Sequence, residues 1–381
     1  MEKCVGRGLI MVGLAVAVGA CAKSTALPTV AASAGSLETD RAIAAALTKK
    51  FDAMRYSLGM PGLAVAILRD TTVLAATGFG FADVEKSVPV TRDTPFNIAS
   101  VSKPISAVAA LQLVESGKLN LDRPMTSFTD FAEFCANARE TGGIFFSNIT
   151  CDSSLTLRRV LSMEANGEPG TRFYYNPPMY SWASRPIAEV AGIPFSDLVT
   201  QSVLIPAGMT RSARQHRRLP LRADLAAELA VPYHDSSGRF VRSQQPAPQG
   251  DGAAGGVIST VSDLAKFDIA LSRNRLISAQ SRELMWTPGR TSAGNVLPYG
   301  LGWFVANVAG EKVVWHTGLW EGAYSALYMK MPERKLTLIL LANSDKLQWE
   351  TRFDEAAIER SPFAMEFLRA FASDQARPSR R

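Results

Sequence analysis

The sequence predicts an α+β protein in which one antiparallel sheet is flanked by N- and C-terminal helices, with an inserted, mostly helical subdomain beside it. Three observations lead to this fold class. Short β-rich runs occur near both ends of the chain. The stretch between them lacks the sustained alternation of apolar and polar residues that is typical of strands. An amphipathic helix lies outside each set of runs. The economical arrangement pairs the N-terminal strands with the C-terminal strands across the insertion.

The N-terminal part of the sheet is predicted to follow an amphipathic helix. Apolar residues recur at helical spacing from 38 to 58, and Gly59 ends that helix. A β hairpin comes next, and then a second helix with a glycine at its C-terminal cap. The predicted elements are a helix over 38–58, strands over 62–68 and 73–77 around the turn 69–71, and a helix over 101–116 capped by Gly117.

The C-terminal part contributes more strands and a closing helix. The stretch 118–250 combines helical pieces with loops rich in Pro and Gly, which predicts a mostly helical region. The four β runs that follow it cover residues 299–305, 312–316, 325–331 and 335–342, and a final amphipathic helix is expected over about 350–372.

Composition supports a globular chain. Of the 381 residues, 47% are hydrophobic and 20% are charged, which excludes a disordered or collagen-like protein. Away from the N-terminus, the run over 336–342 is apolar except for Thr337, and it is far short of the ~20 residues that cross a bilayer. The predicted parts are a signal peptide (1–20), a flexible tether (21–37), one domain (38–372) with an α/β part over about 38–98 and 255–372 and a helical part over about 99–254, and a basic tail (373–381).

The first twenty residues have the layout of a secretory signal. Lys3 and Arg7 precede a short apolar stretch, and the segment Val-Gly-Ala-Cys ending at Cys21 resembles the lipobox of bacterial lipoproteins. We therefore expect an exported bacterial protein, either periplasmic or anchored to a membrane through lipidated Cys21. The alternative is cleavage by the ordinary signal peptidase at about 31–34, with loss of Cys21.

Export affects how the cysteines and charges are interpreted. Cys135 and Cys151 remain as a pair in an oxidising compartment, so we predict a disulfide between them. The net charge of +6 includes a cluster of arginines over 211–222. In an exported protein this cluster is most simply a solvated face, and we expect no nucleic-acid partner.

Several common catalytic motifs are missing from the sequence. It contains no Gly-x-Ser-x-Gly elbow, no Walker loop, no Gly-x-Gly-x-x-Gly after a strand and no His-Glu-x-x-His. The chain has three histidines, of which His216 and His234 are most simply surface residues. We expect neither a metal nor an organic cofactor.

The segment Ser100-Val-Ser-Lys103 opens the strongest predicted helix. Residues three apart on a helix share a face, and a hydroxyl at a helix N-terminus lies near free N–H groups that can stabilise an oxyanion. A lysine becomes a base if burial or a nearby cation lowers its pKa. The structural alternative is a helix-capping Ser100 with a solvated Lys103.

Two later segments complete a possible site. In an extended Tyr174-Tyr175-Asn176, side chains 174 and 176 project to the same side, where the phenol could relay protons and the amide could orient the lysine and a carbonyl. His316, Thr317 and Gly318 end a β run, whose edge can pair with an extended substrate.

The order Ser-x-x-Lys, Tyr-x-Asn, His-Thr-Gly resembles the penicillin-recognising serine hydrolases, closest to class C β-lactamases, D-alanyl-D-alanine carboxypeptidases and β-lactamase-like esterases. The resemblance covers roughly residues 40–345 and implies a β-lactamase/transpeptidase-like fold. The roles that it implies are Ser100 as nucleophile, Lys103 and Tyr174 as proton-transfer pair, Asn176 as substrate and lysine partner, His316 as a cleft residue beside Thr317 and Gly318, and the N–H groups of Ser100 and Leu319 as oxyanion hole.

The sequence also departs from that family. Many relatives carry lysine where His316 stands, and Met163-Glu-Ala-Asn-Gly167 replaces the usual His-Thr-Ser-Gly loop. A histidine is cationic only part of the time, which favours esters or D-amino-acid peptides over β-lactams as substrates. We predict a serine acyl hydrolase of the esterase or carboxypeptidase type. The alternatives are a β-lactamase, a catalytically silent envelope binding protein with this fold, and a purely structural lipoprotein.

Overall fold

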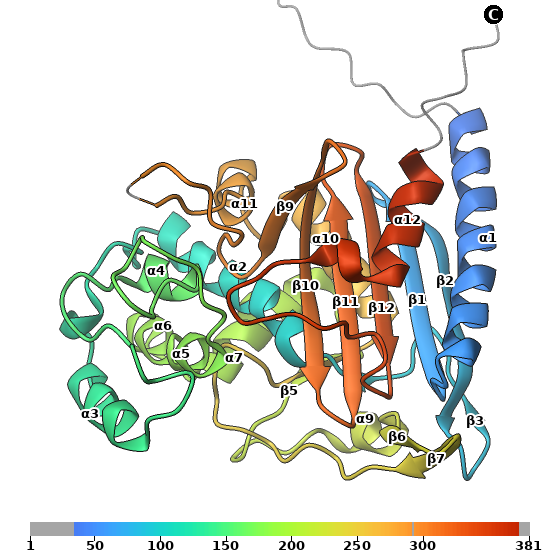
Figure 1. Ribbon diagram of the computed structural model, residues 1–381, viewed down its shortest axis with the longest axis horizontal. Coiled ribbons are helices and arrows are strands. Elements are labelled where there is room, and N and C mark those ends of the chain that lie inside the picture. Colours follow the sequence, from blue (N-terminus) through green and yellow to red (C-terminus); the bar gives the residue numbers. More distant parts are fainter. Residues whose placement is uncertain (1–33, 292, 373–381) are drawn as a thin grey trace, which may run out of the picture.

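The computed structural model describes residues 34–291 and 293–372. A twisted sheet forms one half of the molecule and the inserted short helices form the other half, with α2 (Ser102–Glu115) running between them (Figure 1). Helices α1 (Ala34–Ser57) and α12 (Pro362–Ala372) pack against each other at the sheet, and α10 (Val261–Ser272) packs on β1 and β12. The expected signal peptide, Cys21 and the basic tail lie outside the described residues.

The sheet confirms the predicted α+β class. It has seven antiparallel strands in the order β3-β2-β1-β12-β11-β10-β9, and β1 pairs with β12 from Leu63↔Ala342 to Arg69↔Leu336. Strands from both chain ends therefore meet in the centre, where β11 and β12 are buried throughout. The strands are β1 (Gly62–Arg69), β2 (Thr72–Asp83), β3 (Val88–Pro89), β9 (Phe304–Val308), β10 (Glu311–Trp320), β11 (Tyr324–Met331) and β12 (Leu336–Ala342).

Two expectations for the C-terminal part are wrong. Strand β9 begins at Phe304, five residues later than predicted, and the final helix covers only Pro362–Ala372 after a short turn, η4 (Ile358–Arg360). Proline fits the first turn of a helix but lacks the N–H that a helix interior needs, so Pro362 starts this helix. Residues 348–353 and 355, in the loop before it, line a cavity.

The inserted region is less helical than predicted, because its Pro- and Gly-rich segments break it into short pieces. It also contains a hairpin that the sequence did not indicate. The helices are η2 (Met125–Ser127), α3 (Phe131–Thr141), α4 (Leu157–Leu161), α5 (Pro177–Trp182), α6 (Ser184–Ala191), α7 (Phe195–Val199), η3 (Thr200–Leu204), α8 (Ile205–Ala207), α9 (Ala223–Glu228) and, after the insertion, α11 (Ala279–Met285); the hairpin is β6 (Tyr233–Ser236) and β7 (Arg239–Arg242).

The predicted disulfide joins Cys135 on α3 to Cys151, with the two Cα atoms 6.0 Å apart. It closes the loop that follows α3. Among the described residues, no single helix is long and apolar enough to cross a membrane. No group of three His, Cys, Asp or Glu side chains in the described ranges could hold a metal ion.

The start of α2 is fixed from three sides. A turn of 3-10 helix, η1 (Ala99–Val101), precedes it and packs against β10 and β11. A small sheet of β4 (Phe96–Asn97), β8 (Val257–Ser259) and β5 (Ala213–Arg214) leads into η1, and the Ile98 N–H before η1 donates to the Val257 carbonyl at 3.2 Å. Gly318 on β10 is required here, because a Cβ atom at that position would lie 2.2 Å from the Ile98 carbonyl oxygen. This close approach brings the end of β10 beside Ser100.

Candidate active site

Ser100 and Lys103 lie together at the start of α2, as the three-residue spacing predicts. The Lys103 Nζ donates to Ser100 Oγ at 2.7 Å and to the Ala254 carbonyl at 3.0 Å. The lysine is fully buried, whereas Ser100 lines a cavity. The alternative of a solvated Lys103 is therefore excluded, and Ser100 makes no side-chain cap of the helix.

Burial and two aromatic rings act in opposite directions on the charge of Lys103. Its Nζ lies 5.1 Å from the centre of the Tyr175 ring and 5.5 Å from that of Tyr180, and the face of such a ring attracts a cation. Burial lowers the pKa of Lys103 well below its ordinary value of 10.5. Once the amine is neutral, the same 2.7 Å contact lets the Ser100 hydroxyl donate its proton to Nζ.

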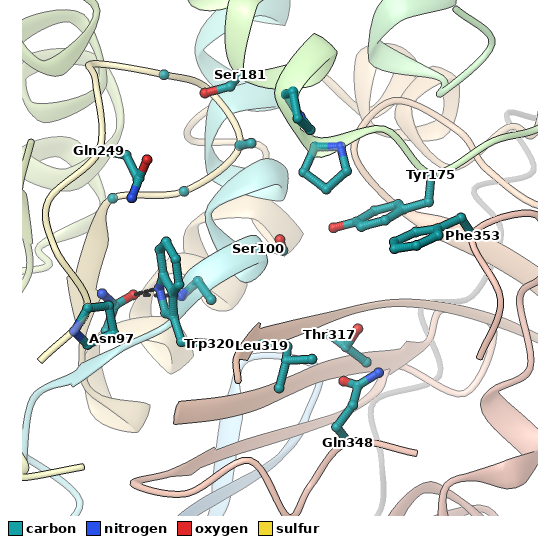
Figure 2. Close-up of a pocket in the computed structure, with 18 of the residues that line it drawn as sticks. Asn97, Ser100, Tyr175, Ser181, Gln249, Thr317, Leu319, Trp320, Gln348 and Phe353 are labelled. Atoms are coloured by element: carbon teal, nitrogen blue, oxygen red, sulfur yellow. Dashed lines mark hydrogen bonds between the residues drawn. The ribbon is translucent and has the colours of Figure 1, made fainter. Parts of the chain in front are cut away.

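The backbone before Ser100 is strained. Ala99 has φ +46°, a left-handed conformation that a residue with a Cβ atom rarely adopts. The Asn97 Oδ1 stabilises it by accepting from the Ala99 N–H and the Trp320 Nε1–H, each at 3.0 Å. The second of these bonds is drawn in Figure 2 and ties η1 to the end of β10. Strain held in this way is typical of functional sites.

The structure brings Tyr175, and not Tyr174, to the serine. Figure 2 shows the Tyr175 hydroxyl directed towards the space in front of Ser100. Tyr174 points away, and its hydroxyl donates to the Ile144 carbonyl at 3.1 Å. Burial raises the pKa of the Tyr175 phenol, opposed by a hydrogen bond with Ser100, so Tyr175 keeps its proton. The sequence suggested a phenol with lowered proton affinity, whereas the phenol beside Ser100 has a raised pKa.

Asn176 is also outside the cavity, contrary to the prediction. Its Oδ1 accepts from the Met179 N–H at 2.9 Å and so caps α5, with Pro177 at the first helical position. Its Nδ2 donates to Asn166 Oδ1 at 2.8 Å and to the Phe145 carbonyl at 2.7 Å. Asn-Pro is a recognisable helix start, and this signal would have assigned Asn176 a structural role from the sequence.

His316 lies behind the cavity wall, and the prediction that it lines the cleft is wrong. The ring is fully buried: Nδ1 donates to the Thr317 carbonyl at 2.6 Å and Nε2 accepts from the Tyr299 hydroxyl at 2.8 Å. Burial lowers the pKa of His316 well below 6.5, a positive charge on Lys103 would lower it further, and the bond to Thr317 opposes both effects. A neutral His316 cannot pair with a substrate carboxylate.

The other residues predicted on the third segment do reach the site. Thr317 and Leu319 line the cavity, and both face the space in front of Ser100 in Figure 2. Gly318 contributes its backbone, which packs on Ile98. The end of β10 thus stands opposite the start of α2, where backbone N–H groups of Ser100 and Leu319 would have to meet an oxyanion.

The cavity in front of Ser100 has a volume of about 740 Å³. Ser100 lies at its centre, between α5, the loop before β8, the end of β10 and the loop after β12 (Figure 2). Its aromatic lining residues are Tyr175, Phe304, Trp320, Trp349 and Phe353, and its amide-bearing ones are Asn97, Gln215, Gln249 and Gln348.

Positive charge is scarce at this cavity. Among the described residues that line it, Arg352 is the only lysine or arginine, beside the acidic Glu350 and Glu355. The Arg352 guanidinium is occupied by the Asp354 carboxylate, to which it donates at 2.9 and 2.6 Å. The lining therefore offers no free cation for an anionic substrate group.

These features define a class of protein: a serine hydrolase of the β-lactamase and penicillin-binding protein superfamily, with serine and lysine one helical turn apart beside a strand edge. The model of the protein family described as Beta-lactamase matches residues 44–361. The chain belongs to this family.

Individual relatives agree with that assignment. Penicillin-binding protein 4* of Bacillus subtilis (strain 168) is 28% identical over 325 residues, which cover 76% of this chain and 70% of that protein. An octameric penicillin-binding protein homologue from Pyrococcus abyssi has a TM-score of 0.65 at 25% identity, covering 80% of this chain and 74% of that one. The D-amino acid amidase of Ochrobactrum anthropi SV3 shares the fold, with a TM-score of 0.66 at 19% identity over 89% of this chain and 99% of the amidase.

Proposed function

We propose that this protein is an exported serine acyl hydrolase that forms an acyl-enzyme on Ser100 and prefers neutral ester or amide substrates. The observation that carries the proposal is the buried Lys103, which reaches Ser100 Oγ at 2.7 Å and has no carboxylate partner among the described residues. Such a lysine is costly to a purely structural protein and useful as a base. This is also the argument against a silent binding protein.

Acylation begins with the neutral Lys103 amine. Nζ takes the proton of Ser100 while Oγ attacks the substrate carbonyl carbon. A bond forms between Oγ and this carbon. The negative charge that develops on the carbonyl oxygen is stabilised by the backbone N–H groups of Ser100 and Leu319, each worth about 3 kcal/mol in such sites. Ser100 is then bonded to a tetrahedral carbon.

Collapse of this intermediate breaks the bond to the leaving group. Tyr175, which keeps its proton in the free protein, donates it to the leaving oxygen or nitrogen, and the proton held by Lys103 restores the phenol. In deacylation a water molecule gives a proton to this pair and attacks the acyl carbon, which releases the acid and the Ser100 hydroxyl. No cofactor takes part in these steps.

The charge of the cavity supports a neutral substrate. His316 is buried and Arg352 is paired with Asp354, so a substrate carboxylate would lose its hydration without gaining a cationic partner. The aromatic lining instead favours apolar groups. Esters should therefore be better substrates than D-alanyl-D-alanine peptides or β-lactams, which both carry a carboxylate.

The test combines a variant with covalent labelling. Ser100→Ala should lower the hydrolysis of 4-nitrophenyl acetate by at least about 10³-fold, and a fluorophosphonate should label the peptide that contains Ser100. Ser57→Ala, at the exposed end of α1, is the matched control and should behave as wild type. Retained activity in Ser100→Ala, or a label elsewhere, would place the nucleophile at another residue.

A comparison of substrates tests the preference. We expect kcat/KM to be highest for the nitrophenyl ester, lower for a D-alanyl-D-alanine peptide and lowest for nitrocefin. A higher kcat/KM for either carboxylate-bearing substrate would contradict the argument from charge.

We also propose that the chain reaches the bacterial envelope as a lipoprotein, on the evidence of the sequence that ends at Cys21. The Cys135–Cys151 disulfide supports an oxidising compartment. Mass spectrometry of the N-terminal peptide from native membranes should find a diacylglyceryl group on Cys21. An unmodified N-terminus near residues 31–34 would indicate ordinary signal cleavage.

A further inference from the structure

We propose that Phe353 is a specificity-determining residue for the leaving group of the substrate; this inference rests on the serine hydrolysis proposed above. Phe353 belongs to the strap, which we define as residues 346–357 between β12 and η4. Most of the strap lies within the segment 350–372 where a helix was expected, and it forms one wall of the cavity.

The strap is anchored in the core at both ends. Leu347 is buried and its N–H donates to Ser325 Oγ at 3.1 Å, and Ala357 is buried at the other end. Residues 350–354 between these anchors are exposed. Because residues 350–354 are not buried in the core, their position in the cavity wall depends mainly on the few contacts that they make themselves.

Phe353 makes these contacts with both its backbone and its ring. Its carbonyl accepts from the Tyr175 N–H at 2.6 Å. Its ring packs edge-on against Phe145 and tilted against Tyr174, with centres 5.1 and 6.0 Å apart. Tyr174, which was predicted to act in catalysis, thus supports the residue that stands next to Tyr175.

The position of Tyr175 shows which part of a substrate Phe353 meets. A group that protonates the leaving atom must lie within hydrogen-bond distance of it. The leaving group therefore lies on the Tyr175 side of Ser100, and Figure 2 shows the Phe353 ring beside Tyr175 on this side. A large leaving group has to pass or displace that ring.

The side chain can be tested without disturbing Tyr175, because the hydrogen bond to Tyr175 comes from the Phe353 backbone. Phe353→Ala removes the ring and keeps the carbonyl. Phe353 is 40% exposed, so the loss of its ring should cost little stability. A change in substrate specificity would then show that the space occupied by the ring limits the leaving group.

Two ester series separate the leaving group from the acyl group. In the first, acetate esters of 4-nitrophenol and the bulkier 4-methylumbelliferol differ in the leaving group. In the second, the nitrophenyl esters of acetate, butyrate and octanoate differ in the acyl chain. Phe353→Ala should raise kcat/KM for the bulkier alcohol relative to nitrophenol by about tenfold, and should change the acyl series by less than about twofold.

The variants Phe353→Leu, Phe240→Ala and Ser100→Ala complete the experiment. Phe353→Leu should keep most of the wild-type profile, and Phe240→Ala removes an equally exposed phenylalanine (41%) on β7, away from the cavity. Unchanged ratios in Phe353→Ala, or a change confined to the acyl series, would overturn this inference while Ser100→Ala remains inactive. Activity that survives in Ser100→Ala, or wild-type protein inactive on every ester, would instead overturn the proposed function together with it.

Discussion

Among the residues that the structure describes, two lysines are buried, and they differ in what surrounds the charge. Lys330 on β11 contacts the carboxylate of Asp268 on α10, which also accepts from the Tyr328 hydroxyl at 2.5 Å. Lys103 on α2 contacts a serine hydroxyl and a backbone carbonyl. An aromatic ring faces each one: Trp286 lies 5.8 Å from the Lys330 Nζ, and Tyr175 lies 5.1 Å from that of Lys103.

The difference shows how to recognise a functional lysine in a buried position. The Lys330–Asp268 ion pair joins the sheet to α10 and has its hydrogen-bonding groups satisfied, as a structural pair does. Burial lowers the pKa of Lys103, which has no carboxylate partner in the part of the chain that the structure describes, and this prepares a base next to Ser100. Both lysines are buried, so the group that each one contacts distinguishes the structural Lys330 from the functional Lys103.

Exchange of each lysine for methionine should give the largest contrast. Lys330→Met leaves the Asp268 charge buried without its partner and should lower the free energy of unfolding by about 3–5 kcal/mol. Lys103→Met removes the base and should lower kcat by about 10²–10⁴-fold, with little loss of stability. Urea denaturation and nitrophenyl acetate hydrolysis measure the two effects.

The double variant Lys330→Met/Asp268→Leu serves as the control, because it removes both charges and should recover part of the lost stability. If Lys103→Met were destabilised as strongly as Lys330→Met, the two lysines would share a structural role and the comparison would fail.

The ring over Lys103 should have a second, smaller effect. Tyr175→Phe keeps the aromatic face and removes the proton that we assign to the leaving group, so kcat should fall by about 10²-fold. Tyr174→Phe is the matched control and should stay within about threefold of wild type, because its hydroxyl contacts the Ile144 carbonyl. Kinetics on 4-nitrophenyl acetate decide between them, and the opposite ranking would restore Tyr174 as the proton donor.

The pH dependence should be the smallest effect. Since burial lowers the pKa of Lys103, the unfolded chain binds a proton there that the folded protein does not, between the lowered value and 10.5. Stability should therefore rise with pH in this window, by at most about 1.4 kcal/mol per pH unit, and kcat/KM should reach its plateau well below pH 10.5. Urea titrations at several pH values should find this slope in wild type and not in Lys103→Met. A slope that persists in the variant would belong to another group.

The sequence determined the parts of this protein that depend on local periodicity. The three-residue spacing of Ser100 and Lys103 places them on one face of any helix, and the mostly apolar runs at 62–68 and 335–342 favour strands of a buried sheet. The sequence also predicted that N-terminal strands pair with C-terminal ones across the insertion, and the structure shows that β1 and β12 form this pair.

Only the tertiary structure decided which neighbours of these elements reach the cavity. Tyr174, Tyr175 and Asn176 lie in an irregular segment, where no repeat fixes the side of each side chain. The direction of Tyr175 depends on Phe353 from the strap, which is far along the chain. That of Asn176 depends on Asn166, which also lies in an irregular segment. The burial of His316 likewise depends on Tyr299, seventeen residues away. Local sequence sets the face of a helix or strand, whereas in a loop that face is set by contacts with residues far along the chain.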